Sequence, residues 1–275
     1  GTGMAATVAS SGGGTFRSAV KVYLGTMTMG WSGQTSSVVD SSVGAAMLDS
    51  FMKRGGVNVD TARIYSSGDC EGIVGGVVRA QEHADKIVMG TKCHPSQQGG
   101  LSADGIRSQL ATSLDALGLE RIEEFYLHQP DTEHSLAASL ECLHQLVQEG
   151  KIGAVGMSNY HADEVARACE ICAEKGYTPP TVYQGLFNPL NRMVEDELLP
   201  VLRANNIQFI AYNPLAAGLL SGKHRNTDGV LEGRFKSTAS CLDGGNAALA
   251  PRPRTWIHHP PFLPPQIIQI TCLVS

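Results

Sequence analysis

Four side chains that can carry or steer a proton lie where short apolar segments of the chain end. Asp60 and Tyr65 belong to the segment NVDTARIY, Lys92 ends KIVMGTK, and His128 ends EFYLH. Ionisable side chains in such places contribute little to stability. In α/β proteins the carboxyl ends of parallel strands meet where active sites lie. We therefore expect these four side chains to gather at one rim of a sheet or barrel.

Together, these residue types could protonate a carbonyl oxygen while a hydride reaches its carbon. A tyrosine hydroxyl, with a pKa of about 10, is a poor acid at neutral pH, and a nearby Lys92 ammonium would lower the pKa of Tyr65. Asp60 would hold the lysine charged and in place, and His128 would orient the carbonyl or relay the proton. The Tyr65 hydroxyl should then lie about 2.6–3.2 Å from Lys92 and His128, or somewhat further away without cofactor. Taken singly, Asp60 could be a helix cap and Tyr65 a packing residue, so the joint pattern carries the prediction.

Regular alternation of apolar strands and amphipathic helices must position these side chains. The pattern predicts strands at residues 20–26, 57–60, 87–92, 124–128, 152–158, 181–185 and 207–212. Between them it predicts helices at residues 38–54, 69–80, 102–117, 136–149, 162–175 and 194–205. Strand–helix units at this spacing imply a parallel sheet, open or closed into a barrel.

Composition narrows the class of protein. The chain has 275 residues, 42% of them hydrophobic, and a formal net charge of -5, which suits one large α/β domain. Without a Lys/Arg block or a run of about 18 apolar residues, we expect neither a nucleic acid nor a membrane as partner. Seven scattered cysteines fit reduced thiols and a cytoplasmic location. Residues 1–19, which begin with a Gly-, Ser- and Ala-rich stretch, are expected to form a flexible leader.

Several segments in order carry a resemblance to a known family. DTARIY, MGTK, YLHQPD, GMSNY, YQGLFNP and AYNPLAAGLLSGK resemble the aldo-keto reductases, most closely the branch of aflatoxin-aldehyde and succinic-semialdehyde reductases. The similarity covers roughly residues 20–235, and it implies a (β/α)8 barrel of the TIM type over residues 20–236. It also implies reduction of a small aldehyde or ketone by NADPH, without a metal. A homodimer is one of the assemblies that the sequence leaves open.

The resemblance assigns a role to each matching position. Tyr65 becomes the general acid, with Asp60, Lys92 and His128 completing a catalytic tetrad. The remaining matches hold the nicotinamide carboxamide (Ser158, Asn159 and Gln184), stack on its ring (Tyr212), wrap the pyrophosphate (Asn213, Leu215, Gly218, Leu220 and Lys223) or line the substrate pocket (Met29 and Trp31). Structural alternatives stay open: Ser158 and Asn159 could cap a helix, and Gln184 could be a buried core amide.

The end of the sequence departs from the family pattern. Residues 237–275 are rich in Ala, Gly, Pro and His, and proline is too dense there for a helix. We therefore expect a barrel that is incomplete at its C-terminal strand and helices, with the eighth position vacant or filled by residues 266–274. Because no motif for an adenosine 2′-phosphate is recognisable, we expect weak cofactor binding with little preference for NADPH over NADH.

Three functions remain open from the sequence. The leading one is an NADPH-dependent carbonyl reductase. The second is a non-catalytic, cofactor-binding regulatory subunit resembling the potassium-channel β-subunits, and the third is an inactive, truncated barrel. Other patterns are less informative: Cys169 and Cys172 have no further ligands nearby for a metal, and the glycines of GIVGG do not follow the dinucleotide-binding spacing.

Overall fold

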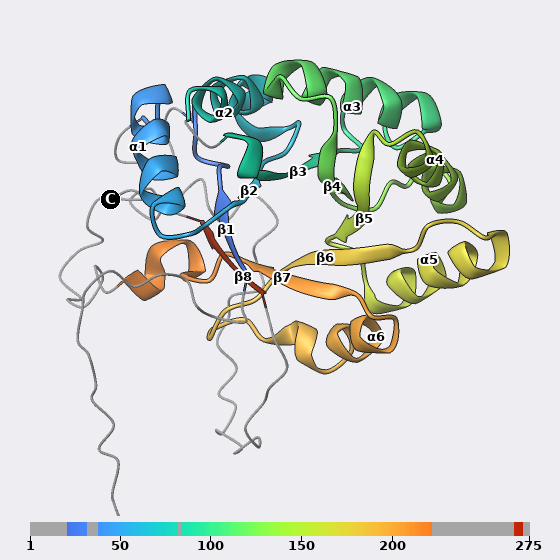
Figure 1. The fold of residues 1–275 in the computed structure, drawn as a ribbon. Helices are drawn as coiled ribbons and strands as arrows, with labels where there is room; N and C mark the ends of the chain where they lie inside the picture. Colours follow the sequence, from blue (N-terminus) through green and yellow to red (C-terminus); the bar gives the residue numbers. More distant parts are fainter. Residues whose placement is uncertain (1–20, 32–37, 82–83, 222–266, 272–275) are drawn as a thin grey trace, which may run out of the picture.

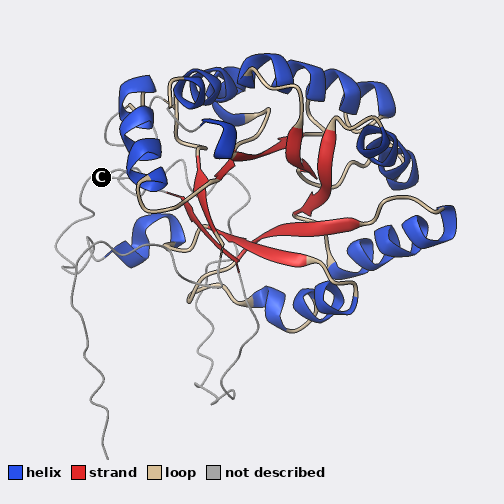
Figure 2. Ribbon diagram, in the orientation of Figure 1, coloured by secondary structure: helices blue, strands red, loops and turns tan. Residues whose placement is uncertain are grey.

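Eight parallel strands close into a barrel with helices around its outside (Figures 1 and 2). The computed structural model describes residues 21–31, 38–81, 84–221 and 267–271. In chain order the strands are β1 (Val22–Gly25), β2 (Asn58–Asp60), β3 (Val88–Cys93), β4 (Ile122–Leu127), β5 (Ile152–Ser158), β6 (Pro180–Leu186), β7 (Gln208–Tyr212) and β8 (Ile267–Thr271). Each strand pairs with the next, and β8 pairs with β1. The prediction of a TIM-type barrel is confirmed.

The eighth position of the barrel is filled, and its occupant lies within the predicted stretch 266–274. β8 has four register pairs with β1 and two with β7. The structure thus has the second of the two expected outcomes, an eighth strand from this stretch. The expected incompleteness at the C-terminal helices falls outside the described residues. Between β7 and β8 the described residues, 213–221, form the 3-10 segment η4 (Ala216–Ser221) and no α-helix.

Six α-helices cover the barrel in the described ranges. They are α1 (Ser41–Met52), α2 (Asp69–Arg79), α3 (Ala103–Leu117), α4 (Leu136–Gln148), α5 (Ala162–Lys175) and α6 (Leu198–Ala204). Shorter 3-10 turns are η1 (Tyr65–Gly68), η2 (Ala84–Lys86) and η3 (Met193–Glu195). None of the helices described is long and apolar enough to cross a bilayer.

Local capping explains why several predicted helix ends are right. The Ser102 hydroxyl accepts a hydrogen bond from the Gly105 amide at 3.0 Å and starts α3. Gly118 then ends the helix in the left-handed region, at φ 69°. The single helix predicted for residues 194–205 is instead split into η3 and α6. Pro200 explains the split, because a proline is tolerated only in the first turn of a helix and disfavours helical backbone before it.

The interior of the barrel is filled by side chains from opposite strands. Tyr23, Tyr126, Val182 and Ile210 form an apolar cluster there. Both tyrosine hydroxyls donate to the buried Glu124 carboxylate, at 2.8 Å and 2.6 Å. On β5, a Cβ at position 156 would lie 2.3 Å from the Tyr126 ring, so only Gly156 allows this ring to lie across the barrel. This packed floor supports the polar groups above it.

Candidate active site

The carboxyl ends of six consecutive strands bring the predicted polar residues to one rim. Asp60 ends β2, Lys92 lies near the end of β3, His128 follows β4, Ser158 ends β5, Gln184 lies on β6, and Tyr212 ends β7. Because all the strands are parallel, these positions share one end of the barrel. Tyr65 follows the end of β2, so the predicted catalytic residues Lys92 and Tyr65 lie at the same end of the barrel.

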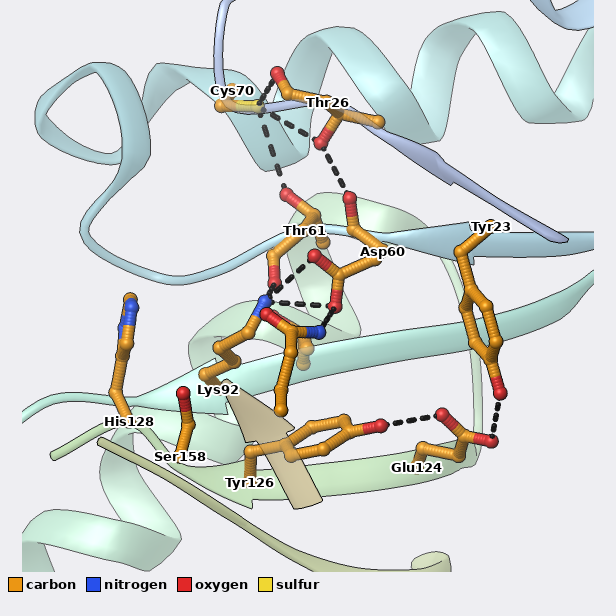
Figure 3. A network of polar contacts seen from close by, with 12 residues as sticks. Tyr23, Thr26, Asp60, Thr61, Cys70, Lys92, Glu124, Tyr126, His128 and Ser158 are labelled. Atoms are coloured by element: carbon orange, nitrogen blue, oxygen red, sulfur yellow. Dashed lines mark hydrogen bonds and ion pairs between the residues drawn. The ribbon is translucent and has the colours of Figure 1, made fainter. Parts of the chain in front are cut away.

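A buried ion pair is the centre of this rim (Figure 3). The Lys92 ammonium donates to both Asp60 carboxylate oxygens at 2.8 Å and to the Thr61 carbonyl oxygen at 2.7 Å. Lys92 is 0% exposed and Asp60 2%. The Gln184 side-chain amide also donates to Asp60, at 2.9 Å. The predicted approach of Lys92 to Asp60 is confirmed, and Gln184 supports the same carboxylate.

Tyr65 meets this pair through its ring instead of its hydroxyl. The Lys92 ammonium lies 5.2 Å from the centroid of the Tyr65 ring, and the His128 ring packs edge-on at 5.8 Å. The predicted hydrogen bonds from the Tyr65 hydroxyl to Lys92 and His128 are absent from the described contacts. An ammonium has three N–H donors, and Asp60 and Thr61 already use all three on Lys92.

The electrostatics of Tyr65 also differ from the expectation. Its pKa is raised well above the usual value, first because burial disfavours the phenolate and then because Asp60 adds a negative charge. The expected net lowering of this pKa is not found, because burial, the largest cause, and the Asp60 charge both raise it. The tyrosine therefore keeps its proton at neutral pH.

His128 is a neutral imidazole in this setting. Burial, the Lys92 charge and the neighbouring His94 lower its pKa from 6.5 to about 2. Its ring packs edge-on against the His94 ring at 5.1 Å. The buried Nδ1 atom has no hydrogen-bond partner among the described residues. The imidazole thus brings hydrogen-bonding capacity to the rim without bringing charge.

Asn159 links three strand ends across the rim. Its side-chain amide donates to the His128 carbonyl oxygen at 2.9 Å and to the Ser158 hydroxyl at 3.1 Å, and its amide oxygen accepts from the Tyr212 hydroxyl at 2.9 Å. The residue has a left-handed backbone, at φ 61°, which asparagine tolerates better than most residues. Asn159 therefore orients Ser158 and Tyr212 beside the Asp60–Lys92 pair.

The sequence model of the Aldo/keto reductase family matches residues 21–243. The chain belongs to this family. It is 43% identical over 237 residues to aflatoxin B1 aldehyde reductase member 2 of Mus musculus, a match that covers 86% of this chain and 62% of that protein. It is 43% identical over 206 residues to aflatoxin B1 aldehyde reductase member 4 of Homo sapiens, covering 74% of this chain and 60% of that protein.

The resemblance to the aflatoxin-aldehyde branch of the aldo-keto reductases is thus confirmed. The chain spans about three fifths of the length of these relatives. Within that span lie all the strands that carry the tetrad.

The described segment directly after β7, residues 213–221, holds several of the predicted pyrophosphate contacts. The Asn213 side chain accepts a hydrogen bond from the Ala217 amide and so closes the turn into η4. Gly218 has a φ of 100°, which favours glycine. Leu215 and Leu220 are 39% and 38% exposed. Their predicted contact with a pyrophosphate stays a prediction, and Lys223 lies outside the described residues.

The two residues predicted to line the substrate pocket behave differently. Met29 is 2% exposed and faces the core between the barrel and its outer helices, in a small apolar cavity it shares with Leu48 and Val77. Met29 thus packs in the core in this structure, and its predicted contact with a substrate stays a prediction. Trp31 lies half-buried in the loop after β1, and its role stays a prediction.

Sequence reasoning missed the support beneath Lys92. The Lys92 ammonium lies 5.7 Å from the centroid of the Tyr126 ring, whose hydroxyl donates to Glu124. Glu124, Tyr126 and His128 alternate along EFYLH, so the period of two in β-strands was an available signal. The Thr61 carbonyl left no such signal, because any residue type supplies a backbone oxygen.

Proposed function

We propose that this chain is the barrel of an NADPH-dependent aldo-keto reductase that reduces an aldehyde or ketone to the alcohol. The observation that carries the proposal is the buried Asp60–Lys92 pair against the ring of Tyr65, at the carboxyl end of the barrel. Family membership supports carbonyl reduction in general. The names of the two relatives, both aflatoxin B1 aldehyde reductases, support aldehydes as the substrate class.

Tyr65 is the proposed proton donor. Its raised pKa keeps the hydroxyl protonated, so the proton is available when negative charge develops on a carbonyl oxygen. The nearby Lys92 ammonium then stabilises the charge left on the tyrosine oxygen. A neutral His128 can donate one hydrogen bond to the same carbonyl oxygen and orient it for protonation.

The donors and acceptors of Ser158 and Gln184 fit a nicotinamide carboxamide. The two residues are register partners on β5 and β6. The Ser158 oxygen accepts from Asn159, which leaves its hydroxyl hydrogen to donate. Gln184 donates to Asp60, which leaves its amide oxygen to accept. A carboxamide needs one such acceptor and one such donor. A reduced nicotinamide, when bound, supplies the hydride.

Tyr212 is proposed to pack against the nicotinamide ring. Its hydroxyl is fixed by Asn159, which holds the aromatic ring beside Ser158 at the rim. The pyrophosphate of the cofactor would meet η4, and Lys223, which lies outside the described residues, is proposed for the same role. We further propose a cytoplasmic location and a homodimer, as expected from the sequence.

Cofactor oxidation by the full chain tests the proposed function. We expect loss of the reduced-nicotinamide absorbance when NADPH and a small aromatic aldehyde are both present, and no loss when either is omitted. Tryptophan fluorescence, titrated with NADPH, measures cofactor binding separately. Binding without turnover would instead support the non-catalytic regulatory alternative, and a folded chain that binds neither NADPH nor NADH would support the inactive barrel.

A further inference from the structure

A further buried carboxylate lies behind the tetrad, in the first turn of α2. Glu71 is 0% exposed. One of its oxygens accepts a hydrogen bond from the Thr91 hydroxyl at 2.6 Å, and the other forms an ion pair with the Arg63 guanidinium. Neither the tetrad nor the carboxamide-binding residues include Glu71, Arg63 or Thr91. We name these three residues the Glu71 clamp.

The two partners of Glu71 lie close in sequence to Tyr65 and Lys92. Arg63 precedes Tyr65 by two residues, and Thr91 directly precedes Lys92 on β3. The Arg63 amide also donates to the Lys92 carbonyl oxygen at 3.1 Å. One carboxylate therefore joins the loop that carries the proposed proton donor to the strand that carries the lysine.

The same guanidinium closes the loop around Tyr65. Arg63 donates to the Gly68 carbonyl oxygen at 2.7 Å, so it joins the two ends of the segment between them. Inside this segment Ser66 and Ser67 have left-handed backbones, at φ 49° and 55°, and Gly68 has a φ of 104°. Such backbone persists in non-glycine residues only where surrounding contacts fix it. A Cβ on Gly68 would lie 2.1 Å from the guanidinium.

Stability alone does not account for the Glu71 clamp. A buried ion pair is often no more stabilising than apolar side chains of the same volume, because both charges must be desolvated. Here the pair instead fixes one geometry for a strained loop. We propose that Glu71 is a positioning residue, which holds Tyr65 at a set distance from Lys92 through Arg63 and Thr91.

This inference rests on the proposed function, and its test separates the two. Glu71→Gln keeps the shape of the side chain and removes its charge, and Glu149→Gln is the matched control, because Glu149 pairs with the exposed Arg107 at the surface. We expect Glu71→Gln to lower kcat about 10²-fold, the cost of misplacing a reacting group by about 1 Å. The KM for the aldehyde and the Kd for NADPH should change little, and Glu149→Gln should match the wild type.

A second pair of variants tests the positioning role even if Glu71→Gln fails to fold. Thr91→Val removes the hydroxyl that bonds Glu71 at nearly constant volume, whereas Thr91→Ser keeps it. We expect Thr91→Val to lower kcat and Thr91→Ser to restore most of it. A purely structural role would instead lower the folded fraction and leave kcat per folded molecule unchanged.

Hydrogen–deuterium exchange tests the positioning claim without turnover. In Glu71→Gln the amides of Arg63 and Tyr65 should exchange faster, while those of β4 and β5 stay protected. If the wild type reduces no aldehyde, the proposed function fails, yet faster exchange confined to this loop still supports the positioning role. Unchanged exchange, or a full kcat with a loosened loop, would overturn it.

Discussion

Replacing Tyr65 by phenylalanine separates chemistry from stability at this site. The ring contacts with Lys92 at 5.2 Å and His128 at 5.8 Å remain in Tyr65→Phe. No described residue makes a hydrogen bond to the hydroxyl, so its removal breaks none. We expect the free energy of unfolding to change by less than about 0.5 kcal/mol, as for a substitution that removes no specific contact.

The rate of reduction should respond very differently. Loss of a positioned proton donor costs about 10²–10⁴-fold in rate, which corresponds to about 3–5 kcal/mol on the barrier at ~1.4 kcal/mol per tenfold. The cofactor Kd should stay near the wild-type value, because Ser158 and Gln184 are untouched. Tyr177→Phe is the matched control. Tyr177 follows α5 at the opposite end of the barrel, where its ring stacks on that of His144 in α4. Wild-type turnover in Tyr65→Phe would refute the assignment of the proton donor.

Three further predictions concern the same rim. Lys92→Met leaves the buried Asp60 carboxylate without its ion-pair partner, so urea denaturation should show a loss of about 3–5 kcal/mol, in contrast to Tyr65→Phe. The pKa of His128 is lowered from 6.5 to about 2, so below about pH 6.5 this histidine is protonated in the unfolded chain but not in the folded one. Stability should therefore fall as the pH drops below about 6.5. In thermal unfolding, His128→Asn should show a weaker pH dependence than the wild type. Binding of both cofactors should be weak, and the measured Kd values for NADPH and NADH should differ by less than about tenfold. Tight, NADPH-selective binding would contradict this prediction.

The elements that position the rim were predictable where the local signals were complete. The bounds predicted for β5 and α5 agree with the structure. Glycines at the ends of the preceding and following helices mark these boundaries, and Gly176 ends α5 at φ 70°. The break between η3 and α6 was also readable in principle, because Pro200 cannot lie in a helix interior.

The side-chain contacts at the rim were only partly predictable. Spacing placed Asp60, Lys92 and His128 at neighbouring strand ends, and the Asp60–Lys92 contact followed from their opposite charges. The contact between Lys92 and Thr61 depends on a backbone carbonyl, which no residue type encodes. This third contact uses the last N–H donor of the Lys92 ammonium, so no donor is left for the Tyr65 hydroxyl. The sequence alone therefore could not show that the expected Lys92–Tyr65 bond is missing.

The saturated ammonium has a consequence for the handling of aldehydes. A lysine attacks a carbonyl through the lone pair of its neutral amine and then forms a Schiff base. In Lys92 all three N–H groups are donated, to Asp60 and to Thr61, and the side chain is fully buried. With each N–H directed at an oxygen of the protein, the nitrogen offers no free direction for attack on a carbonyl carbon. The lysine can therefore sit beside a reactive aldehyde as a fixed charge without becoming its nucleophile.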